Sequence, residues 1–309
     1  MYKNFQYTVS MEDFNMSLTL KDYLRQKFNF SSRLMTKIKK NKGLFLNGES
    51  APGWIVPKEN DVITVNLPKE TSNFHPENIP IRVVYEDEDM MVINKQPFVV
   101  VHPTSSHLNG TIANGVSNYM IENSSEFKIR FINRLDRDTS GLLIIGKNSN
   151  AQNKISIQMA ENNVLKEYVA IVSGIVENSK GTIDLPIGRP SPTDIKRAVM
   201  KNGSKSITHY KVISTFKNKI SGKGYTILSL KLETGRTHQI RVHMAYIRHP
   251  LLGDEVYGKG KNPFGITGQV LHAKTLGFVH PATKKYMEFD SELPCEFEKV
   301  LTCVRKKQG

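Results

Sequence analysis

The sequence predicts an α+β protein of two domains, in which a small N-terminal α/β domain precedes a larger domain with a mixed, largely antiparallel β-sheet flanked by helices. The chain has 309 residues, near the length of two average domains, since one core rarely grows beyond about 250–300 residues. The stretch PKETSNFHPENIP, from Pro68 to Pro80, holds three prolines and little apolar periodicity, which indicates a linker. Predicted strands and helices then alternate irregularly, which favours α+β over a regular βαβ array. We divide the chain into an N-terminal extension (1–14), a small domain (15–68), a linker (69–80) and a large domain (81–309).

The small domain is predicted to hold two short helices followed by strands. The first helix is indicated by apolar residues at helical spacing, Leu18, Leu20, Tyr23 and Leu24. The second helix takes Ser31 or Ser32 as its N-cap and ends at Gly43. The run LFLNGE predicts a strand that enters an Asn47-Gly48 turn, and DVITVNL predicts a closing strand.

The second helix carries a run of cations, Arg33, Lys37, Lys39, Lys40 and Lys42. Such a run is often only a solvated helix face, but it could also neutralise RNA phosphates. The order of a helix, SSRLMTKIKKNKG, LFLNGE and VPKENDVITV resembles the alpha-L RNA-binding domain of a small-subunit ribosomal protein and several RNA-modifying enzymes. The resemblance covers about residues 15–68, and it implies RNA contacts by Arg33, Lys37, Lys39 and Lys40.

The charge of the whole chain favours a polyanionic partner. The sequence holds 43 Lys and Arg against 29 Asp and Glu, a formal net charge of +14, which fits nucleic acid or an acidic membrane surface. The longest apolar runs, such as 142–145, are far shorter than the roughly 20 residues that span a bilayer, and the first residues lack a signal-peptide pattern. We therefore expect a cytoplasmic protein with no membrane partner. The cysteines, Cys295 and Cys303, show neither a disulfide framework nor zinc-ligand spacing.

The large domain opens with IRVVYEDEDMMVINK, which predicts two strands around an acidic turn. Further strands are predicted from Tyr168 to Val172 and from Tyr225 to Leu232. In the last of these, Leu228, Leu230 and Leu232 alternate with polar residues, a period that is typical of a half-buried antiparallel strand.

Two patterns that suggest other chemistries are rejected. The stretch GLLIIGKN matches a phosphate-binding loop up to Lys147, but Asn148 stands where that loop needs Ser or Thr for magnesium, and LLII is typical of a buried strand. His238 and His243 are five residues apart, and no carboxylate or cysteine completes a ligand set, so we expect no metal site.

The segment FINRLDRDTSGLLIIGK, residues 131–147, places two carboxylates and two arginines in a loop before an apolar strand: Asp136, Asp138, Arg134 and Arg137. These charges allow two interpretations. In one, the aspartates cap backbone amides and pair with the arginines, as in a structural turn. In the other, one aspartate is a positioned nucleophile or acid.

RLDRDTSGLL resembles the signature of the RluA-type pseudouridine synthases, the uridine isomerases of ribosomal and transfer RNA. Four further blocks occur in the order of that family: VVYEDEDMMVINK, KEYVAIVSG, LETGRTHQIRVHM and HPLLGDEVYG. Together the blocks cover nearly all of residues 80–290. The sequence departs from the family at Asn133, where histidine is common, and after Lys95, where Gln96-Pro97-Phe98-Val99 replaces Lys-Pro followed by small residues and glycine. Both departures bear on the shape of the pocket.

The resemblance implies roles for four residues. Asp136 is the catalytic carboxylate, Arg134 helps to hold the RNA where the target uridine leaves its helix, Tyr168 lies under the uracil ring, and Arg241 pairs with Asp136. Burial raises the pKa of a carboxylate, so a cationic neighbour is needed to keep it ionised. We place Arg241 near the start of a helix capped by Thr237, off the apolar stripe of Ile240, Met244 and Ile247.

Isomerising uridine breaks the bond from base nitrogen to sugar, turns the uracil and rejoins it through C5, so nothing is consumed and we expect neither cofactor nor metal. The target base must leave its stack to react. We therefore expect an RNA pseudouridine synthase that acts on large-subunit ribosomal RNA, and a monomer because no residue of the site is missing. Two alternatives stay open: a transfer RNA uridine isomerase, and a non-catalytic RNA-binding or ribosome-assembly factor.

Overall fold

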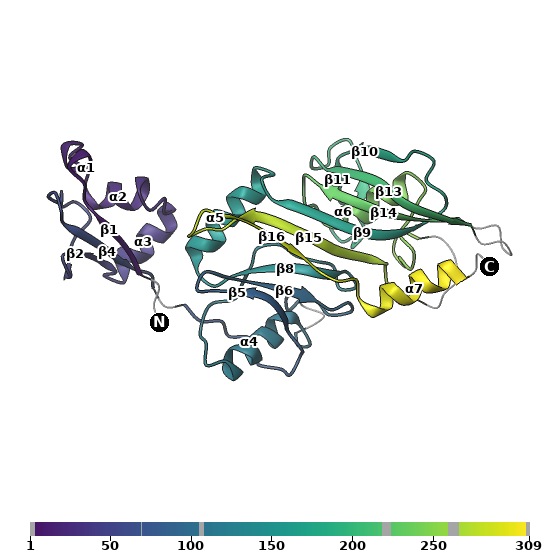
Figure 1. Cartoon of the computed structure of the whole chain (residues 1–309), viewed down its shortest axis with the longest axis horizontal. Coiled ribbons are helices and arrows are strands. Elements are labelled where there is room, and N and C mark those ends of the chain that lie inside the picture. The colour runs from purple at the N-terminus through teal and green to yellow at the C-terminus, as the bar shows by residue number, and fades with distance from the viewer. Residues whose placement is uncertain (1–3, 69, 105–107, 218–223, 259–265, 307–309) are drawn as a thin grey trace.

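Two sheets of different size organise the chain in the computed structural model, which describes residues 4–306 apart from 69, 105–107, 218–223 and 259–265. The smaller sheet belongs to an N-terminal domain, and the larger sheet forms the centre of the remaining chain (Figure 1). A short two-stranded ladder of β11 (Ile187–Gly188) and β12 (Ala198–Val199) adds to the large domain. The predicted α+β class is confirmed.

The N-terminal sheet has the strand order β1–β4–β2–β3. Its strands are β1 (Asn4–Thr8), β2 (Leu44–Leu46), β3 (Glu49–Ser50) and β4 (Val62–Asn66). The expected extension over residues 1–14 is therefore wrong, because all of β1 pairs antiparallel with β4, and Phe5 and Tyr7 pack on the core. Two aromatics alternating with polar residues over five positions are too short a signal to separate such a strand from an unstructured terminus.

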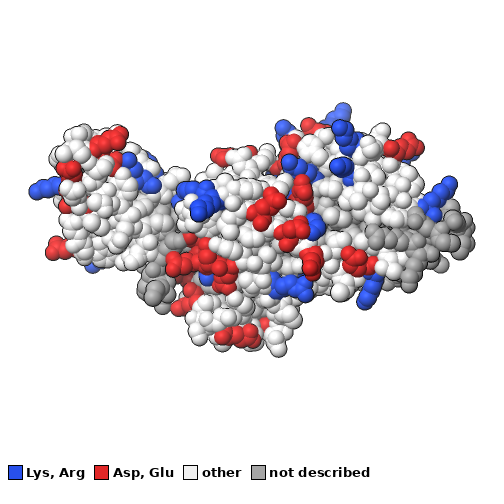
Figure 2. Space-filling view, in the orientation of Figure 1, with Lys and Arg blue, Asp and Glu red and all other residues white. Residues whose placement is uncertain are grey.

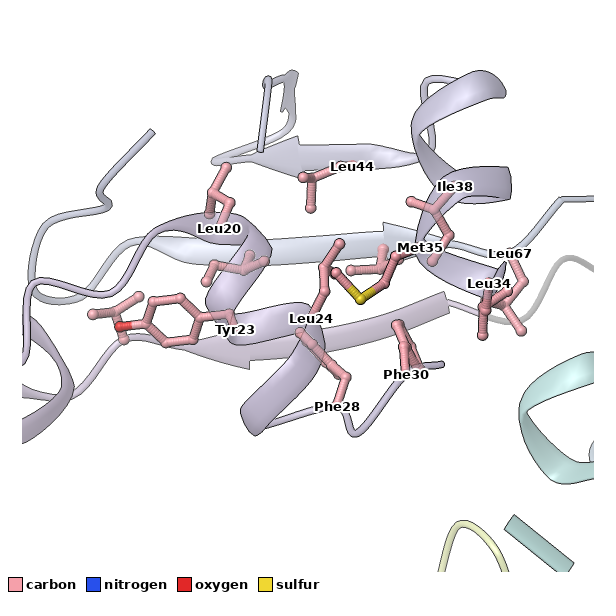
Figure 3. Packing of buried hydrophobic residues seen from close by; sticks show 13 residues of the cluster. Leu20, Tyr23, Leu24, Phe28, Phe30, Leu34, Met35, Ile38, Leu44 and Leu67 are labelled. Carbon is pink, nitrogen blue, oxygen red and sulfur yellow. The ribbon is translucent and has the colours of Figure 1, made fainter. Parts of the chain in front are cut away.

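The helices of this domain are α1 (Met11–Asn15), α2 (Leu20–Gln26) and α3 (Ser32–Lys40). Thr19 and Asp22 form a capping box at the start of α2, and Ser31 caps α3 as predicted. Figure 3 shows how apolar side chains of α2 and α3 meet those of the strands in one core, including Leu20, Tyr23, Leu24, Leu34, Met35, Ile38 and Leu44. The two predicted helices are confirmed, and α1 is an additional one.

Residues 70–80, most of the predicted linker, contain no helix or strand. They are nevertheless attached to the large domain by hydrogen bonds. The backbone N–H of Ile129 donates to Ser72 Oγ (2.7 Å), and the side chain of Asn114 donates to the carbonyl of His75 (2.8 Å). The segment therefore lies along the large domain as a strap.

The large sheet has the order β10–β13–β14–β9–β15–β8–β6–β5, with β16 on β15 and β7 on β8. Its strands are β5 (Arg82–Glu86), β6 (Met90–Lys95), β7 (Arg130–Phe131), β8 (Ser140–Gly146), β9 (Leu165–Ser173), β10 (Lys180–Asp184), β13 (Ile207–Lys217), β14 (Gly224–Leu232), β15 (Leu271–Val279) and β16 (Tyr286–Asp290). β15 and β8 run parallel, whereas the other described neighbours run antiparallel. The predicted mixed, largely antiparallel sheet is confirmed.

Helices α4 (Ile112–Glu122), α5 (Ser149–Ala160), α6 (Gln239–Tyr246) and α7 (Cys295–Lys306) flank this sheet (Figure 1). Alternate residues of β8 pack against α4 and α5, which explains why all seven of its residues are buried, as the LLII run predicted. Along β14 the predicted period of two holds from Leu228 to Leu232, against α6. Ile227 is also buried, because α7 covers the other face there. Within the described residues, no helix is both long and apolar enough to cross a membrane.

Candidate active site

Asp136 lies in the loop that leads from β7 into β8. The side chain of Asn133 fixes this loop to β8, because it accepts from the N–H of Ile144 (2.7 Å) and donates to the carbonyl of Leu142 (3.3 Å). A backbone hydrogen bond from Thr139 to the carbonyl of Asp136 (3.1 Å) closes a turn around the aspartate. Asn133, one of the two departures from the family pattern, therefore supports the loop through hydrogen bonds.

Lys95, the last residue of β6, is hydrogen-bonded to the loop that contains Asp136. Its side chain is fully buried, and Nζ donates to the carbonyls of Gln96 (2.9 Å), Val99 (2.8 Å) and Arg137 (2.9 Å). Burial lowers the pKa of Lys95 to about 7, although the charges of the two loop aspartates oppose this shift. The lysine was not identified from sequence, where the only signal is a cation at the end of an apolar strand.

Arg241 joins the loop to α6. Its Nη1 donates to Asp136 Oδ2 (3.0 Å), which is the pair that the resemblance implies. The expected place off the apolar stripe is wrong, because Arg241 is 94% buried. Asp254 explains why a cation is stable there: it accepts from Nε (2.8 Å) and Nη2 (2.9 Å) in a bidentate pair. Burial opposes the charge, but Asp254 and Asp136 together raise the pKa of Arg241 above its ordinary value.

Asp254 is itself buried and also accepts from the backbone N–H groups of Val256 (2.9 Å) and Tyr257 (3.0 Å). Burial would raise its pKa, but Arg241 and these amides lower it below the ordinary value, so the carboxylate is ionised. Asp254 and Tyr257 both lie in the block HPLLGDEVYG. No local spacing indicates that this block contacts the loop of Asp136, which lies more than a hundred residues earlier.

The start of α6 differs from the expectation. The N-cap is His238 in a left-handed conformation (φ 58°) without a side-chain cap, and Thr237 does not cap the helix. The hydroxyl of Thr237 instead accepts from Arg134 Nη2 (2.7 Å), which keeps that exposed guanidinium at the rim of the site. The unusual backbone of His238 moves the helix start by one residue, and local propensity does not reveal it.

Tyr168 on β9 and Asp136 line one small open pocket between the loop and α6, together with Arg134, Leu232, His238, Ile240, Arg241 and Leu271. Burial raises the pKa of Tyr168, and the nearby charge of Asp136 adds to this, so the hydroxyl keeps its proton. The structure thus brings the four predicted residues of the large domain to a single pocket. A pocket lined by leucines, an aromatic ring, a carboxylate and arginines suits a flat, polar base.

The cations predicted to contact RNA lie on α3, away from this pocket. Arg33, Lys39 and Lys40 are exposed, whereas Lys37 pairs with Glu70 of the strap (2.7 Å). On the face shown in Figure 2, cationic and anionic side chains are interspersed over both domains. The net positive charge is therefore not gathered into one patch on that face.

One group in the described part of the chain has the composition of a metal site, Asp87, Asp89 and His280. Asp87 and Asp89 lie at the turn between β5 and β6, at the far end of β6 from Lys95, and His280 directly follows β15. His280 Nδ1 accepts from the backbone N–H groups of residues 282 (3.2 Å) and 283 (3.0 Å), so its proton is on Nε2, which donates to Asp87 (2.7 Å). These hydrogen bonds account for the group as a structural turn.

A sequence model of the RNA pseudouridylate synthase family matches residues 89–246. An uncharacterised RNA pseudouridine synthase of Bacillus subtilis, YjbO, is 38% identical over 287 residues, which cover 92% of this chain and 98% of that protein. The ribosomal large subunit pseudouridine synthase D of Haemophilus influenzae is 38% identical over 255 residues, 79% of this chain and 76% of that protein. The solved structure of human RNA pseudouridylate synthase domain containing 1 has a similar fold, with a TM-score of 0.58 and 24% identity over 74% of this chain and 96% of that one.

Proposed function

Because the chain belongs to the RNA pseudouridylate synthase family, we propose that it isomerises uridine to pseudouridine in large-subunit ribosomal RNA. The observation that carries the proposal is the contact between Arg241 and Asp136 in a pocket lined by Tyr168. The choice of RNA is supported by the name of the Haemophilus influenzae relative. The N-terminal domain, with its resemblance to an RNA-binding domain, supports the same choice.

Asp136 is the reacting carboxylate in this proposal. In the reaction the bond from C1′ of the ribose to N1 of uracil breaks and a bond from C1′ to C5 forms, while C5 loses a proton and N1 gains one. Atoms and charge balance without a co-reactant, so no cofactor or metal is required. Arg241 orients Asp136 through the hydrogen bond from Nη1 to Oδ2, and the charge of Arg241 itself is largely compensated by Asp254.

The target nucleotide reaches Asp136 only after it leaves its base stack, which costs a few kcal/mol and less in a loop or bulge. Tyr168 offers a flat face to the flipped uracil, and such stacking contributes about 1–3 kcal/mol per base. Arg134 stands at the pocket rim, where its charge can pair with the phosphates on either side of the flipped nucleotide.

The N-terminal domain supplies a second RNA contact in this proposal. Arg33, Lys39 and Lys40 are exposed and can pair with phosphates directly. Lys37 must first exchange its carboxylate partner Glu70 for a phosphate, so we expect it to contribute less. Since Asp136, Tyr168 and Arg241 all come from one chain, we infer that a monomer is active. A ribosomal RNA substrate implies a cytoplasmic location.

The direct test uses RNA labelled with tritium at C5 of uracil, because isomerisation releases that label to water. Wild-type protein should release tritium from large-subunit ribosomal RNA in the presence of a chelator, and Asp136→Asn should release none. Asp138→Asn, which removes the other carboxylate of the same loop, is the matched control and should remain active. Undiminished release by Asp136→Asn would overturn the assignment of the reacting group.

The substrate is tested separately by mapping pseudouridines in total RNA from cells with and without the gene. Loss of a pseudouridine from large-subunit ribosomal RNA supports the proposal. Loss of a pseudouridine from transfer RNA alone would show that the substrate is transfer RNA instead. If no pseudouridine is lost from any RNA, the protein is better explained as a non-catalytic RNA-binding or ribosome-assembly factor.

A further inference from the structure

His238 lies beside Asp136, although nothing in the proposed reaction uses it. Its Nε2 is 3.8 Å from Asp136 Oδ2, and its side chain is 13% exposed. The residue has a left-handed backbone (φ 58°), which is uncommon for a residue with a side chain and persists where the surrounding structure imposes it. A residue held in this way beside a reacting group is a candidate for a positioning role.

A chain of hydrogen bonds fixes the proton of this histidine. The backbone N–H of Arg197 can only donate, and it donates to the hydroxyl oxygen of Tyr257 (2.8 Å). The same hydroxyl lies 2.9 Å from His238 Nδ1. Within the described residues, His238 Nδ1 is the only acceptor within hydrogen-bond distance of this hydroxyl, so the hydroxyl donates its single proton to Nδ1. With Nδ1 accepting, the proton of the neutral ring is on Nε2, the nitrogen that faces Asp136.

Two further observations support this assignment. Burial lowers the pKa of His238 below its ordinary value. The charges of Asp136 and Asp254 oppose this shift and those of Arg241 and Arg197 add to it, and the net shift is downward, which favours the neutral ring near pH 7. Burial also raises the pKa of Tyr257, so its hydroxyl keeps the proton that it donates. The guanidinium of Arg241 lies over the ring of Tyr257 at 5.2 Å, which couples the tyrosine to the cation that holds Asp136.

We propose that His238 is a positioning residue for Asp136, and that Tyr257 and Arg197 set its tautomer. Both contacts of the carboxylate then use Oδ2, with Arg241 on one side and His238 Nε2–H on the other. Among the described residues none donates to Oδ1, which is therefore the oxygen presented to the substrate. If the distance between His238 Nε2 and Asp136 Oδ2 shortens by about 1 Å, the two atoms are within hydrogen-bond distance. The positioning role of His238 rests on the proposed function of Asp136. The tautomer of His238 is a property of the folded protein and does not depend on that function.

Nitrogen-15 NMR of labelled imidazoles measures the tautomer in the folded protein without any substrate. The resonances of His238 are assigned by their loss in His238→Asn. We expect a protonated Nε2 and an unprotonated Nδ1 in the wild type, and a mixture of tautomers in Tyr257→Phe, which removes only the hydroxyl. A protonated Nδ1 in the wild type, or an unchanged Nε2–H form in Tyr257→Phe, would overturn the relay whether or not the enzyme is active.

Kinetics of tritium release then tests the positioning role. Tyr257→Phe should lower kcat in proportion to the share of the Nε2–H tautomer that the NMR spectra show to be lost, with little change in KM. His238→Asn, which removes the imidazole contact itself, should lower kcat by about 10- to 100-fold, because a misplacement of about 1 Å at a reacting group has effects of this size. His238→Gln keeps an N–H near the place of Nε2 and should retain more activity than His238→Asn, even though asparagine adopts the left-handed backbone more readily. Equal activity of these two variants would show that backbone geometry alone matters and would refute the positioning role.

Discussion

Asp254 is the residue whose replacement tests the electrostatics of the site most sharply. Asp254→Asn keeps the shape of the side chain but removes its charge. The amide of asparagine also places an N–H group against Nε or Nη2 of Arg241, which both donate to Asp254 in the native protein. A buried guanidinium then loses its bidentate partner and faces a second donor.

The size of the effect follows from this geometry. Breaking a buried ion pair on one side costs about 3–5 kcal/mol, because the remaining charge is left uncompensated. For a domain of about 150–250 residues, the size range of the large domain, 1 kcal/mol lowers Tm by about 2–4 °C, so Asp254→Asn should lower the Tm of this domain by about 6–20 °C. Arg241 is then free to turn fully to Asp136, and the altered orientation of the carboxylate should reduce kcat by about 100-fold.

Thermal unfolding followed by circular dichroism and tritium release measure the two effects on the same protein. Glu255→Gln, a neighbouring exposed carboxylate, is the matched control and should change neither. The double variant Arg241→Met, Asp254→Leu should recover only part of the lost Tm and no activity. Apolar residues can replace the packing of a buried ion pair, but the backbone N–H groups of Val256 and Tyr257 lose their acceptor. A Tm of Asp254→Asn within about 2 °C of the wild type would refute the claim that Asp254 compensates the buried guanidinium.

Two other predictions concern salt and pH. Replacing Arg33, Lys39 or Lys40 by Ala should reduce the slope of log affinity against log salt, measured by RNA titration, by about 0.7–0.9 for each lost phosphate contact. If the slopes equal that of the wild type, these residues belong to a solvated helix face and do not contact RNA. Lys95 is the second case, since burial lowers its pKa to about 7 while its unfolded value is about 10.4. The unfolded chain binds more protons between these values, so this site makes stability rise with pH by at most about 1.4 kcal/mol per unit from about pH 7 to 10. Urea unfolding of Lys95→Met should show a smaller rise over that range, and a rise as steep as in the wild type would count against the depressed pKa.

Much of the fold could be predicted because its signals are local. The run around β8 is apolar and bounded by a glycine and Asn148, which caps α5, and both features act within a few residues. Ser31 and the Asn47-Gly48 turn are equally local, and the strands around them have the predicted positions. The motif containing Asp136 was identified by resemblance, since its charges alone equally fitted a structural turn.

The contacts that complete the site could not be predicted, because they join residues that are distant in sequence. The pairing of Arg241 with Asp136 was expected only from the resemblance, and only the fold shows that Arg241 is buried and that Asp254 also compensates its charge. Lys95 is held by carbonyl groups, which carry no sequence signal at all. The left-handed backbone of His238 is likewise set by the surrounding structure and not by the propensity of histidine.

The strap has a consequence for how the two domains act together. Leu67 packs in the N-terminal core, and Glu70 is paired with Arg130 of the large domain, so only residues 68 and 69 separate the two bodies. Three residue steps span at most about 11 Å. Once one domain holds an RNA, a tether this short keeps the other at a millimolar effective concentration near the same molecule, provided that the geometry permits both contacts. Weak individual contacts between α3 and RNA would then suffice to prolong the residence of the RNA, because the RNA is released only when both domains are dissociated from it at the same time.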